Sequence, residues 1–477
     1  MKSFWLLLFI LAFAAASPVR AQQPPLQQRV EAELARATET RFGLVVADEA
    51  GRELIAIQPD GRFLPASNTK LLPTIAAYAR SAGINITNAV GAAVALRPQP
   101  GGRPDVVLSG AGDAGLSSAA DCVTYCLAQL ADAVAAKTKQ VGNVIGDATL
   151  FADERWSPGM SWNNIHTRSG TAVSALNVDD NELVLRVSPG AAGQPPTLDH
   201  LPYYRIVNGA KTVAAQGNSQ LSFTRLPGSD LVHLTGTITA GAEPVTLRLG
   251  IDDPAHYAAW RMRALLEARG VRVGGKTAAQ YRAPGSRIPF PFPAHDALAR
   301  LNSPSTSSEI VRINKESHNL RADLLLRKLG LVVIGATGSI GDGVQIVEHV
   351  MDEAGVLRTG WDISDGSGMS TYNRLSPRAV VKLLRWAAAQ PWGAQWRQSL
   401  PVAGVDGTLA RRFRGTSLER RLFAKTGALN ATNALSGYMI ARSGRTLTFS
   451  FFANDIPGGG GATATMDAAL QLIADSN

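Results

Sequence analysis

The stretch Ser67-Asn68-Thr69-Lys70 decides how the rest of the chain is interpreted, and it is the only S-x-x-K in the 477 residues. On a helix, residues three apart share one face, so the Lys70 amine would lie one turn from the Ser67 hydroxyl. A serine hydroxyl is a weak nucleophile until a base removes its proton. A lysine can be that base where desolvation or a nearby positive charge lowers its pKa. The stretch therefore predicts a nucleophilic serine with a lysine base, but the pattern alone arises by chance about once in a chain of this size.

Two other short motifs follow it in the sequence. Ser317-His318-Asn319 provides an S-x-N pattern just before an apolar helix. A second S-x-N, Ser161-Trp162-Asn163, has no regular element around it to hold a catalytic side chain. Lys425-Thr426-Gly427 ends an apolar stretch that is typical of a strand. A lysine and a threonine there can face a cleft and bind a carboxylate, and the glycine lets a substrate strand approach the backbone.

The order S-x-x-K, S-x-N, K-T-G is the active-site set of penicillin-binding proteins and serine β-lactamases, which the chain resembles. Ser67 and Ser317 are 250 residues apart, far more than simple β-lactamases or the smallest carboxypeptidases use. This separation is similar to that in the D-alanyl-D-alanine carboxypeptidase/endopeptidases of the penicillin-binding protein 4 type (class C, low molecular mass). That family carries two extra domains between its first two motifs.

Three further stretches support the same resemblance. Ser109-Gly110-Ala111-Gly112-Asp113 resembles the family's G-G-D-P segment, and Asp365-Gly366-Ser367-Gly368-Met369-Ser370 resembles its D-G-S-G-L-S. Leu400–Leu409 resembles its L-P-x-A-G-x-D-G-[ST]-L. The chain departs from the family at His318, where an aspartate is frequent. Because this middle position is variable, the departure bears on rate or pH dependence more than on identity.

The resemblance implies a role for each motif residue. Ser67 would attack the carbonyl of the penultimate D-alanine, Lys70, neutral in the resting site, would take its proton, and Ser317 would relay a proton to the leaving amine with help from both lysines. The backbone N–H groups of Ser67 and Ala428 would form the oxyanion hole. The implied substrate-binding residues are Asn319 for the amide, Lys425 and Thr426 for the terminal carboxylate, and Gly427 and Ala428 beside them. The expected partners are peptidoglycan stem peptides, with β-lactams as covalent inhibitors at Ser67.

Two other functions share these motifs. A β-lactamase or esterase of the same fold is the closer alternative, and the long separation of the motifs and the D-G-S-G stretch argue against it. A penicillin-binding sensor or a cell-wall scaffold without turnover is the other. A scaffold could lose Lys70 or Lys425 without penalty, and the chain keeps both.

The distribution of predicted elements favours an α+β fold of the penicillin-recognising serine hydrolase type. Predicted strands at both ends of the chain, with helices between them, indicate one catalytic domain made of residues 22–89 and 297–477. One of those helices, Leu320–Leu329, is expected to end at Gly330. Residues 90–296 are rich in Gly, Pro, Val and Thr with short β-type runs, which predicts a β-rich insertion of two small domains.

Residues 1–21 have the pattern of a secretory signal peptide. Lys2 precedes the apolar run Phe4–Ala16, which is short for a membrane span, and Val19-Arg20-Ala21 offers small residues for cleavage. The sequence therefore predicts an exported, periplasmic protein with no transmembrane anchor once the signal peptide is removed.

Other classes of function find little support. The formal net charge is +9, but no Lys/Arg run with interleaved aromatic residues suggests nucleic-acid binding. The seven histidines and two cysteines show no metal-ligand spacing, so we expect neither a metal nor a cofactor. Gly270–Thr277 fits the P-loop pattern letter by letter, but a predicted helix precedes it and β-type residues follow it, which inverts the order that a P-loop needs.

Two local features carry separate predictions. Cys122 and Cys126 would face an oxidising compartment, but on a regular helix their Cβ atoms would be about 5–6 Å apart, more than the roughly 3.8 Å of a disulfide. A disulfide between them therefore requires a local departure from helix. Phe151–Asn164, with Trp156 and Trp162, is a candidate wall for the leaving-group side of the cleft, the alternative being simple packing between domains.

Overall fold

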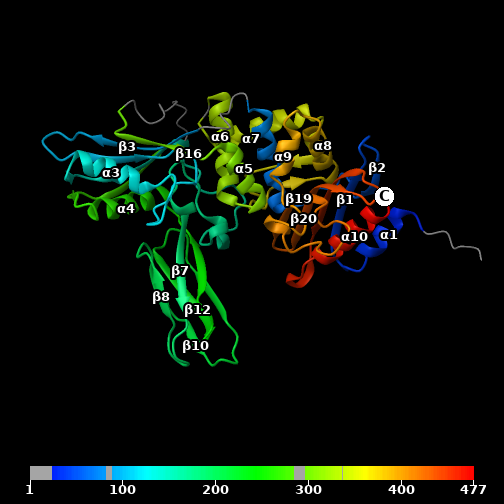
Figure 1. Cartoon of the computed structure of the whole chain (residues 1–477), viewed down its shortest axis with the longest axis horizontal. Helices are drawn as coiled ribbons and strands as arrows, with labels where there is room; N and C mark the ends of the chain where they lie inside the picture. Colours follow the sequence, from blue (N-terminus) through cyan, green and yellow to red (C-terminus); the bar gives the residue numbers. More distant parts are fainter. Residues whose placement is uncertain (1–23, 82–88, 284–295, 336) are drawn as a thin grey trace, which may run out of the picture.

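The computed structural model describes residues 24–81, 89–283, 296–335 and 337–477, so the predicted signal peptide lies outside the described residues. None of the helices in these ranges is long and apolar enough to cross a membrane. The chain forms an α+β fold, as predicted, with one sheet-and-helix body at one end, a second sheet at the other and a narrow β arm that projects from the second part (Figure 1).

The main sheet is assembled from both ends of the chain. Its strand order is β19-β20-β21-β1-β2, and every neighbouring pair is antiparallel. The strands are β1 (Arg41–Ala47), β2 (Glu53–Ile57), β19 (Leu422–Leu429), β20 (Thr432–Ile440) and β21 (Thr446–Asn454). The pairing of β1 with β21 joins the N-terminal and C-terminal strands in one sheet. This agrees with the prediction that both ends of the chain build one domain.

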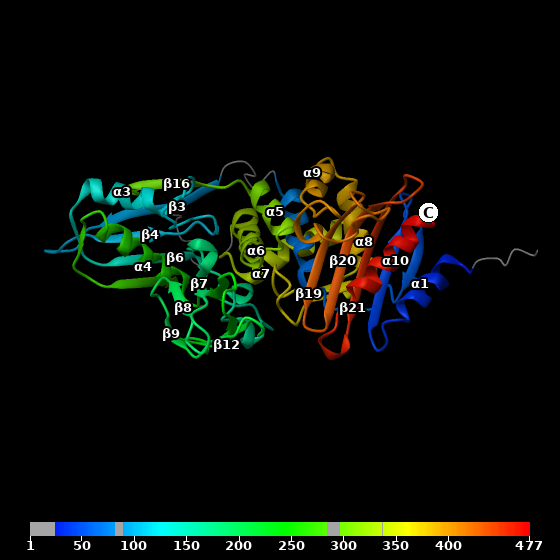
Figure 2. The same cartoon turned by 60° about the horizontal axis from the view of Figure 1, so that its bottom comes forward.

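Both faces of this sheet are covered by helices. Alternate residues of a strand point to opposite faces, and Phe42, Leu44 and Val46 of β1 pack in the core under α1 (Leu26–Leu34) and α10 (Thr463–Asp475). Figure 2 shows α1 and α10 side by side along the strands. The intervening Val45 and Ala47 pack instead against α8 on the other face. Each such fully buried aliphatic side chain contributes about 1.5–3 kcal/mol relative to exposure.

The helices on that other face flank the S-x-x-K and S-x-N motifs, which lie at the starts of α2 and α6. They are α2 (Leu71–Ala79), α5 (Thr306–Lys315), α6 (Asn319–Ile334), α7 (Ile340–Glu353), α8 (Pro377–Ala388) and α9 (Gly393–Gln398). Between α7 and α8 the chain forms the short pair β17 (Trp361–Asp362) and β18 (Arg374–Leu375).

The prediction that the helix after Asn319 ends at Gly330 is wrong. Helix α6 continues to Ile334 and ends at Gly335, which adopts a left-handed φ of 62°. A Cβ at position 330 would lie 2.4 Å from the Cβ of Asp342 on α7. The glycine therefore serves a close approach of two helices rather than a helix end.

The second sheet has the order β15-β6-β4-β3-β16. Its strands are β3 (Ala89–Arg97), β4 (Asp105–Ser109), β6 (Val144–Ala152), β15 (Thr277–Arg282) and β16 (Ala299–Ser303), with β5 (Gln140–Val141), β14 (Arg272–Val273) and the helices α3 (Leu127–Lys137) and α4 (Pro254–Glu267) beside them. Residues 299–303 thus pair with β3, although the sequence-based boundary assigned them to the catalytic domain. Helix α4 precedes Gly270–Thr277 and a strand follows it, the inverted order that argued against a P-loop.

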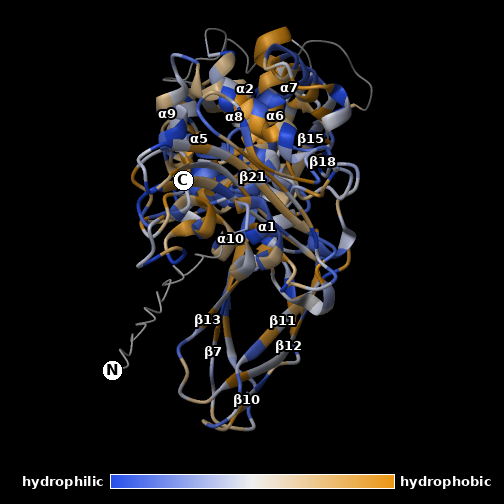
Figure 3. Ribbon diagram, turned by 90° about the vertical axis from the view of Figure 1, so that its right-hand side faces the viewer, coloured by the Kyte–Doolittle hydropathy of each residue, from blue (hydrophilic) through white to orange (hydrophobic). Residues whose placement is uncertain are grey.

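The projecting arm consists of two small sheets, β13-β7-β8 and β10-β12-β11 with β9. The strands are β7 (Glu182–Ser188), β8 (Thr197–His200), β9 (Arg205–Asn208), β10 (Lys211–Val213), β11 (Gln220–Thr224), β12 (Leu231–Thr239) and β13 (Val245–Gly250). Hydrophilic and hydrophobic residues are mixed along these strands (Figure 3), as in sheets with one buried face.

Cys122 and Cys126 form a disulfide. The backbone between them is not helical, because α3 begins only at Leu127 and Tyr125 has a positive φ of 57°. The predicted bond and the predicted departure from helix are both present.

Candidate active site

The S-x-x-K motif lies in a tight turn before α2. Ala66–Lys70 forms a 3₁₀-helix, and Ala66 has a φ of 45°. Two glycines press against this turn: a Cβ at Gly368 would lie 1.9 Å from the Ala66 carbonyl oxygen, and one at Gly427 would lie 3.1 Å from the Ser67 nitrogen. The second glycine of D-G-S-G and the glycine of K-T-G are therefore required at these positions, because a side chain there would keep the backbone from approaching the Ser67 turn so closely.

Lys70 is fully buried and makes three hydrogen bonds. Its Nζ lies 2.9 Å from the Oγ of Ser67 and 2.7 Å from the Oδ1 of Asn319, and it also contacts the carbonyl oxygen of Ser367. Ser67 itself is half-buried. A partly exposed serine hydroxyl is thus hydrogen-bonded to a buried amine.

Burial lowers the pKa of Lys70 to about 8, although the nearby carboxylates of Asp323 and Asp365 act in the opposite direction. Burial and the charge of Asp365 raise the pKa of Asp323 to about 7. The pKa of Lys70 is thus depressed in the predicted direction, with burial as the main cause. At pH 7 a pKa of about 8 leaves most Lys70 protonated in the free protein, which differs from the neutral lysine that the resemblance implied for the resting site.

The serine of the S-x-N motif is hydrogen-bonded to the lysine of the K-T-G motif. Lys425 is fully buried, and its Nζ donates to the Oγ of Ser317 at 2.8 Å and to the carbonyl oxygen of Thr426 at 2.9 Å. Ser317 has a φ of 59°, so the chain turns sharply at this residue before α6 begins. Burial, and then the positive charge of Lys70, hold the pKa of Lys425 well below its usual range.

The K-T-G strand lies beside this pair. Lys425, Thr426, Gly427 and Ala428 all belong to β19, and the Asn68 side chain donates to the Lys425 carbonyl oxygen at 2.9 Å. The hydroxyl of Thr426 donates to that of Thr408 at 2.7 Å, in an exposed position. The S-x-x-K, S-x-N and K-T-G motifs therefore converge on one site, with lysines buried below half-buried or exposed hydroxyls.

The insertion reaches the site through Asn319. The Nδ2 of Asn319 donates to the carbonyl oxygen of Ser169 at 2.9 Å, while its Oδ1 accepts from Lys70. The next residue of the insertion, Gly170, accepts a hydrogen bond from the Nε1 of Trp156 at 2.9 Å. Both ends of the Asn319 amide are thus engaged in the free protein.

The middle residue of S-x-N is also held by the insertion. His318 is buried, and its Nε2 lies 3.5 Å from the Oδ1 of Asp180. Asp180 also pairs with the buried Arg321 at 2.5 Å. Burial alone would raise the pKa of Asp180, but His318, Arg321 and Arg312 outweigh it and hold that pKa well below its usual range.

The D-G-S-G loop is organised by Asp365. This buried carboxylate accepts hydrogen bonds from the backbone N–H groups of Gly368 and Ser370 and from the Asn373 side chain. On its outer side, the Ser370 hydroxyl donates to the carbonyl oxygen of Pro158 at 2.6 Å. The segment Phe151–Asn164 therefore lies directly beside this loop, and Trp162 in it is 64% exposed.

Sequence reasoning missed three residues of this site. Asp323 follows Asn319 by four residues, a spacing that places both on one face of a helix, so it could have been found. Ser169 and Asp180 come from the insertion and carry no motif. Among the described residues, no group of three or more His, Cys, Asp or Glu side chains is arranged to hold a metal ion.

Comparison with known proteins gives the family. The family model described as the D-Ala-D-Ala carboxypeptidase 3 (S13) family matches residues 26–476. The chain is 34% identical over 459 residues to a D-alanyl-D-alanine carboxypeptidase of Actinomadura sp. (strain R39), covering 91% of this chain and 81% of the relative. It is 23% identical over 338 residues to the D-alanyl-D-alanine carboxypeptidase DacB of Haemophilus influenzae, covering 69% and 68% of the two chains.

The fold agrees with that family. The crystal structure of penicillin binding protein 4 (dacB) from Haemophilus influenzae matches with a TM-score of 0.77 at 20% identity, over 94% of this chain and 98% of that chain. The same protein complexed with a novel β-lactam matches with a TM-score of 0.73 at 19% identity, over 94% and 99% of the chains. The predicted family, fold and enzyme class, a serine-type D-Ala-D-Ala carboxypeptidase, are confirmed, and the chain belongs to the D-Ala-D-Ala carboxypeptidase 3 (S13) family.

Proposed function

We propose that this chain removes the terminal D-alanine from peptidoglycan stem peptides through an acyl-enzyme on Ser67. The observation that carries the assignment is the 2.9 Å contact between the Ser67 hydroxyl and the buried Lys70 amine. A serine so placed needs only a deprotonated lysine to become a nucleophile. The catalytic work is assigned to the layer built from both ends of the chain, without residues 299–303, which pair with β3 in the second sheet. The insertion is proposed to supply supports for the S-x-N motif.

The substrate would bind first through its carboxylate. Lys425 and Thr426 are proposed to hold this group beside Gly427 and Ala428. An anion next to Lys425 favours its charged form, and a charged Lys425 disfavours a second charge on Lys70. Carboxylate binding would therefore move positive charge from Lys70 to Lys425 and leave Lys70 as a neutral base. This step accounts for a lysine that is mostly protonated in the free protein and deprotonated when needed.

The later steps follow from the same contacts. The Ser67 and Ala428 N–H groups are assigned to the oxyanion hole, where donors stabilise charge that develops only in the transition state. Lys425 donates a hydrogen bond to the Ser317 hydroxyl. This pair is therefore proposed to deliver a proton to the amine of the leaving D-alanine. Asn319 would hold the substrate amide through its Nδ2, exchanging its bond to Ser169 for one to the substrate.

The signal-peptide pattern and the substrate class together support a periplasmic location. β-Lactams imitate the D-Ala-D-Ala end and are proposed as covalent inhibitors at Ser67.

The test is release of D-alanine from a peptide that ends in D-Ala-D-Ala, with Ser67→Ala as the inactive control. Benzylpenicillin turnover is followed in parallel. Steady hydrolysis of benzylpenicillin without D-alanine release would favour the β-lactamase alternative. A stable penicilloyl adduct with no D-alanine release would favour the sensor.

A further inference from the structure

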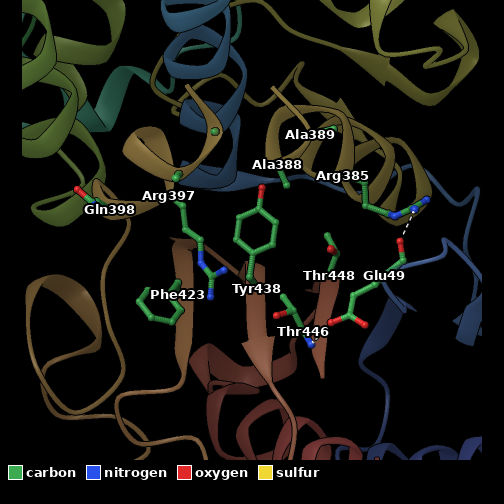
Figure 4. A pocket seen from close by; sticks show the side chains of 12 residues that line it. Glu49, Arg385, Ala388, Ala389, Arg397, Gln398, Phe423, Tyr438, Thr446 and Thr448 are labelled. Carbon is green, nitrogen blue, oxygen red and sulfur yellow. Dashed lines mark hydrogen bonds between the residues drawn. The ribbon is translucent and has the colours of Figure 1, made fainter. Parts of the chain in front are cut away.

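A cavity of about 560 Å³ lies in the catalytic layer outside the motif-lined site. It is bounded by α8 and α9 on one side and by β19, β20 and β21 on the other (Figure 4). The lining residues are Glu49, Arg385, Ala388, Ala389, Gly393, Ala394, Arg397, Gln398, Phe423, Tyr438, Thr446 and Thr448. Small-molecule sites span roughly 300–1,000 Å³, so this volume is sufficient for a ligand of that class.

One wall of the cavity holds an arginine in a fixed position. The Arg397 guanidinium carbon lies 4.3 Å from the ring centre of Phe423 and 5.2 Å from that of Tyr438. The Tyr438 hydroxyl donates to the carbonyl oxygen of Leu384 at 2.7 Å, which fixes its ring. Figure 4 shows the guanidinium between these two rings. Stacking holds the plane of the group and leaves its N–H donors free.

Arg397 has no anionic partner within the part of the chain that the structure describes. Among the described residues, no carboxylate lies within ion-pair distance of Arg397, and its guanidinium makes no hydrogen bond. Burial lowers the pKa of Arg397. By contrast, the buried Arg225 is paired bidentately with Asp252 at 2.6 Å. The two aromatic rings offset part of the hydration that this half-buried cation loses. They supply no hydrogen-bond acceptor for its N–H groups, so an anion would complete the site.

The other end of the cavity is polar, and the lining as a whole carries an excess of positive charge. Arg385 donates to the backbone carbonyl oxygen of Glu49 at 3.1 Å, and the Glu49 carboxylate accepts from the Thr446 N–H at 2.7 Å. The hydroxyls of Thr446 and Thr448 make no hydrogen bond within the described part of the chain. With two guanidinium groups and one carboxylate, the lining carries a formal charge of +1.

We propose that this cavity binds an organic carboxylate, whose anionic end pairs with Arg397 and whose apolar body lies over Ala388, Ala389 and Phe423. The planar guanidinium presents parallel N–H donors that match the two oxygens of a carboxylate. A single carboxylate matches the excess of one positive charge, whereas a phosphate dianion would face the Glu49 carboxylate with too few cations. Phe423 precedes Lys425 by two residues on β19, so the ligand would lie on the same face of the strand that carries the catalytic lysine.

The test uses naphthoate as the probe, with naphthalenemethanol as its neutral match and D-alanine as a small carboxylate. Each is titrated into the purified full chain by calorimetry. Naphthoate should bind, and naphthalenemethanol should bind at least about tenfold more weakly, because a hydrogen bond to a charged group is lost. D-Alanine, which has the carboxylate but no large apolar body, should bind at least about tenfold more weakly than naphthoate, and equal affinity would overturn the role assigned to the apolar body.

Two variants locate the binding. Arg397→Gln keeps a polar side chain, although a shorter one, and removes the charge, so it should weaken naphthoate binding about tenfold or more. Ala388→Phe fills the cavity from an exposed position and should weaken it similarly. The matched control is Arg411→Gln, a change at an exposed arginine outside the lining, which should have no effect.

Melting curves show whether each variant folds, and Ala388→Phe decides the matter if Arg397→Gln does not fold. The proposal is overturned if naphthoate fails to bind, if the neutral probe binds equally, or if both cavity variants bind naphthoate as the native chain does. Binding that benzylpenicillin abolishes while both variants retain it would assign the anion to the Ser67 site instead. D-Alanine release is assayed separately, so a failure of naphthoate to bind would not bear on the proposed carboxypeptidase activity.

Discussion

The Nζ of Lys70 lies 2.7 Å from the Oδ1 of Asn319, although 249 residues separate them in the sequence. The other end of the same amide donates to the Ser169 carbonyl oxygen in the insertion. One side chain therefore links the proposed base, the S-x-N motif and the inserted segment. The insertion is thereby part of the support of the site, and changes in it should be detectable in the chemistry at Ser67.

The first prediction concerns the nucleophile. The purified protein should gain one penicilloyl group on Ser67, because its hydroxyl is partly exposed to solvent and is hydrogen-bonded to the Lys70 amine. Ser67→Ala should abolish the adduct while Lys70 keeps its contacts with Asn319 and Ser367. Intact mass and peptide mapping measure this. An adduct on Ser161 or Ser317 would contradict the assignment.

The second prediction concerns the base. Penicillin acylation should rise with pH through an ionisation near 8, because only the deprotonated form of Lys70 accepts a proton and burial sets its pKa there. Lys70→Arg keeps the charge but cannot lose it at these pH values. The acylation rate of this variant should fall by about 10²–10⁴-fold. Stopped-flow acylation between pH 5 and pH 10, a range of about five units around the lysine ionisation, gives both results, and a nearly normal rate in Lys70→Arg would refute the role.

The third prediction tests the carboxylate beside this lysine. The charge of Asp323 raises the pKa of Lys70, so Asp323→Asn should lower that pKa and move the rise of the acylation profile to lower pH. The expected shift is on the order of one unit. Asparagine retains an oxygen for the Gly366 N–H. Asp352→Asn, at an exposed position on α7, is the matched control and should leave the profile in place.

The catalytic motifs were predictable because their chemistry fixes residue types at fixed spacings. Ser67 and Lys70 had to lie one turn apart, and Lys425 had to follow an apolar strand, and both conditions can be read from the sequence. That both ends of the chain build one domain was predictable from the β-type runs near each end. That β1 pairs with β21 was not, because each strand also has a neighbour in sequence to pair with.

The contacts made by the insertion could not be predicted in this way. Ser169 acts through its backbone carbonyl oxygen, which every residue type possesses. Asp180 contacts His318 from a turn in which residues 179–181 all have positive φ values. Nothing in the local sequence pattern predicts this turn. Gly330 was misread as a helix end because a glycine required by packing and one required by a turn are identical in sequence.

The fourth prediction concerns that inserted contact. Asp180→Ala removes the partner of His318 and one of the two carboxylates paired with the buried Arg321. Loss of a hydrogen bond to a charged, buried group costs about 1–3 kcal/mol, so the free energy of unfolding should fall by that amount. The penicillin acylation rate should fall as well, because Ser317 and Asn319 flank His318.

Denaturant unfolding and acylation kinetics measure both effects. Asp230→Ala, which breaks an exposed ion pair with Arg205 on the arm, is the control. It should have little effect on the free energy of unfolding and none on the acylation rate, because exposed ion pairs contribute little to stability. If Asp180→Ala lowers stability but leaves acylation unchanged, the insertion supports the fold and not the site.

The last prediction concerns which bonds are cut. A D-alanyl cross-link between stem peptides presents the same kind of D-amino-acid carboxylate to Lys425 and Thr426 as a D-Ala-D-Ala end does. The acyl chemistry at Ser67 is then the same, and only the leaving group differs, being larger and carrying its own polar end. The leaving side must therefore stay open and have a wall that a larger group can contact.

Phe151–Asn164 remains the candidate for that wall, because Pro158 is bonded to Ser370 beside the D-G-S-G loop and Trp162 is 64% exposed. We expect cross-linked dimers to be cleaved as well as pentapeptides. Trp162→Ala should slow dimer cleavage more than pentapeptide cleavage, since only the dimer's leaving group is large enough to use an exposed aromatic surface. Purified dimeric and pentapeptide muropeptides, incubated separately and followed by mass, decide this. D-Alanine release with intact dimers would restrict the enzyme to carboxypeptidase activity, and equal slowing of both substrates would mean that Trp162 only supports packing between the insertion and the loop.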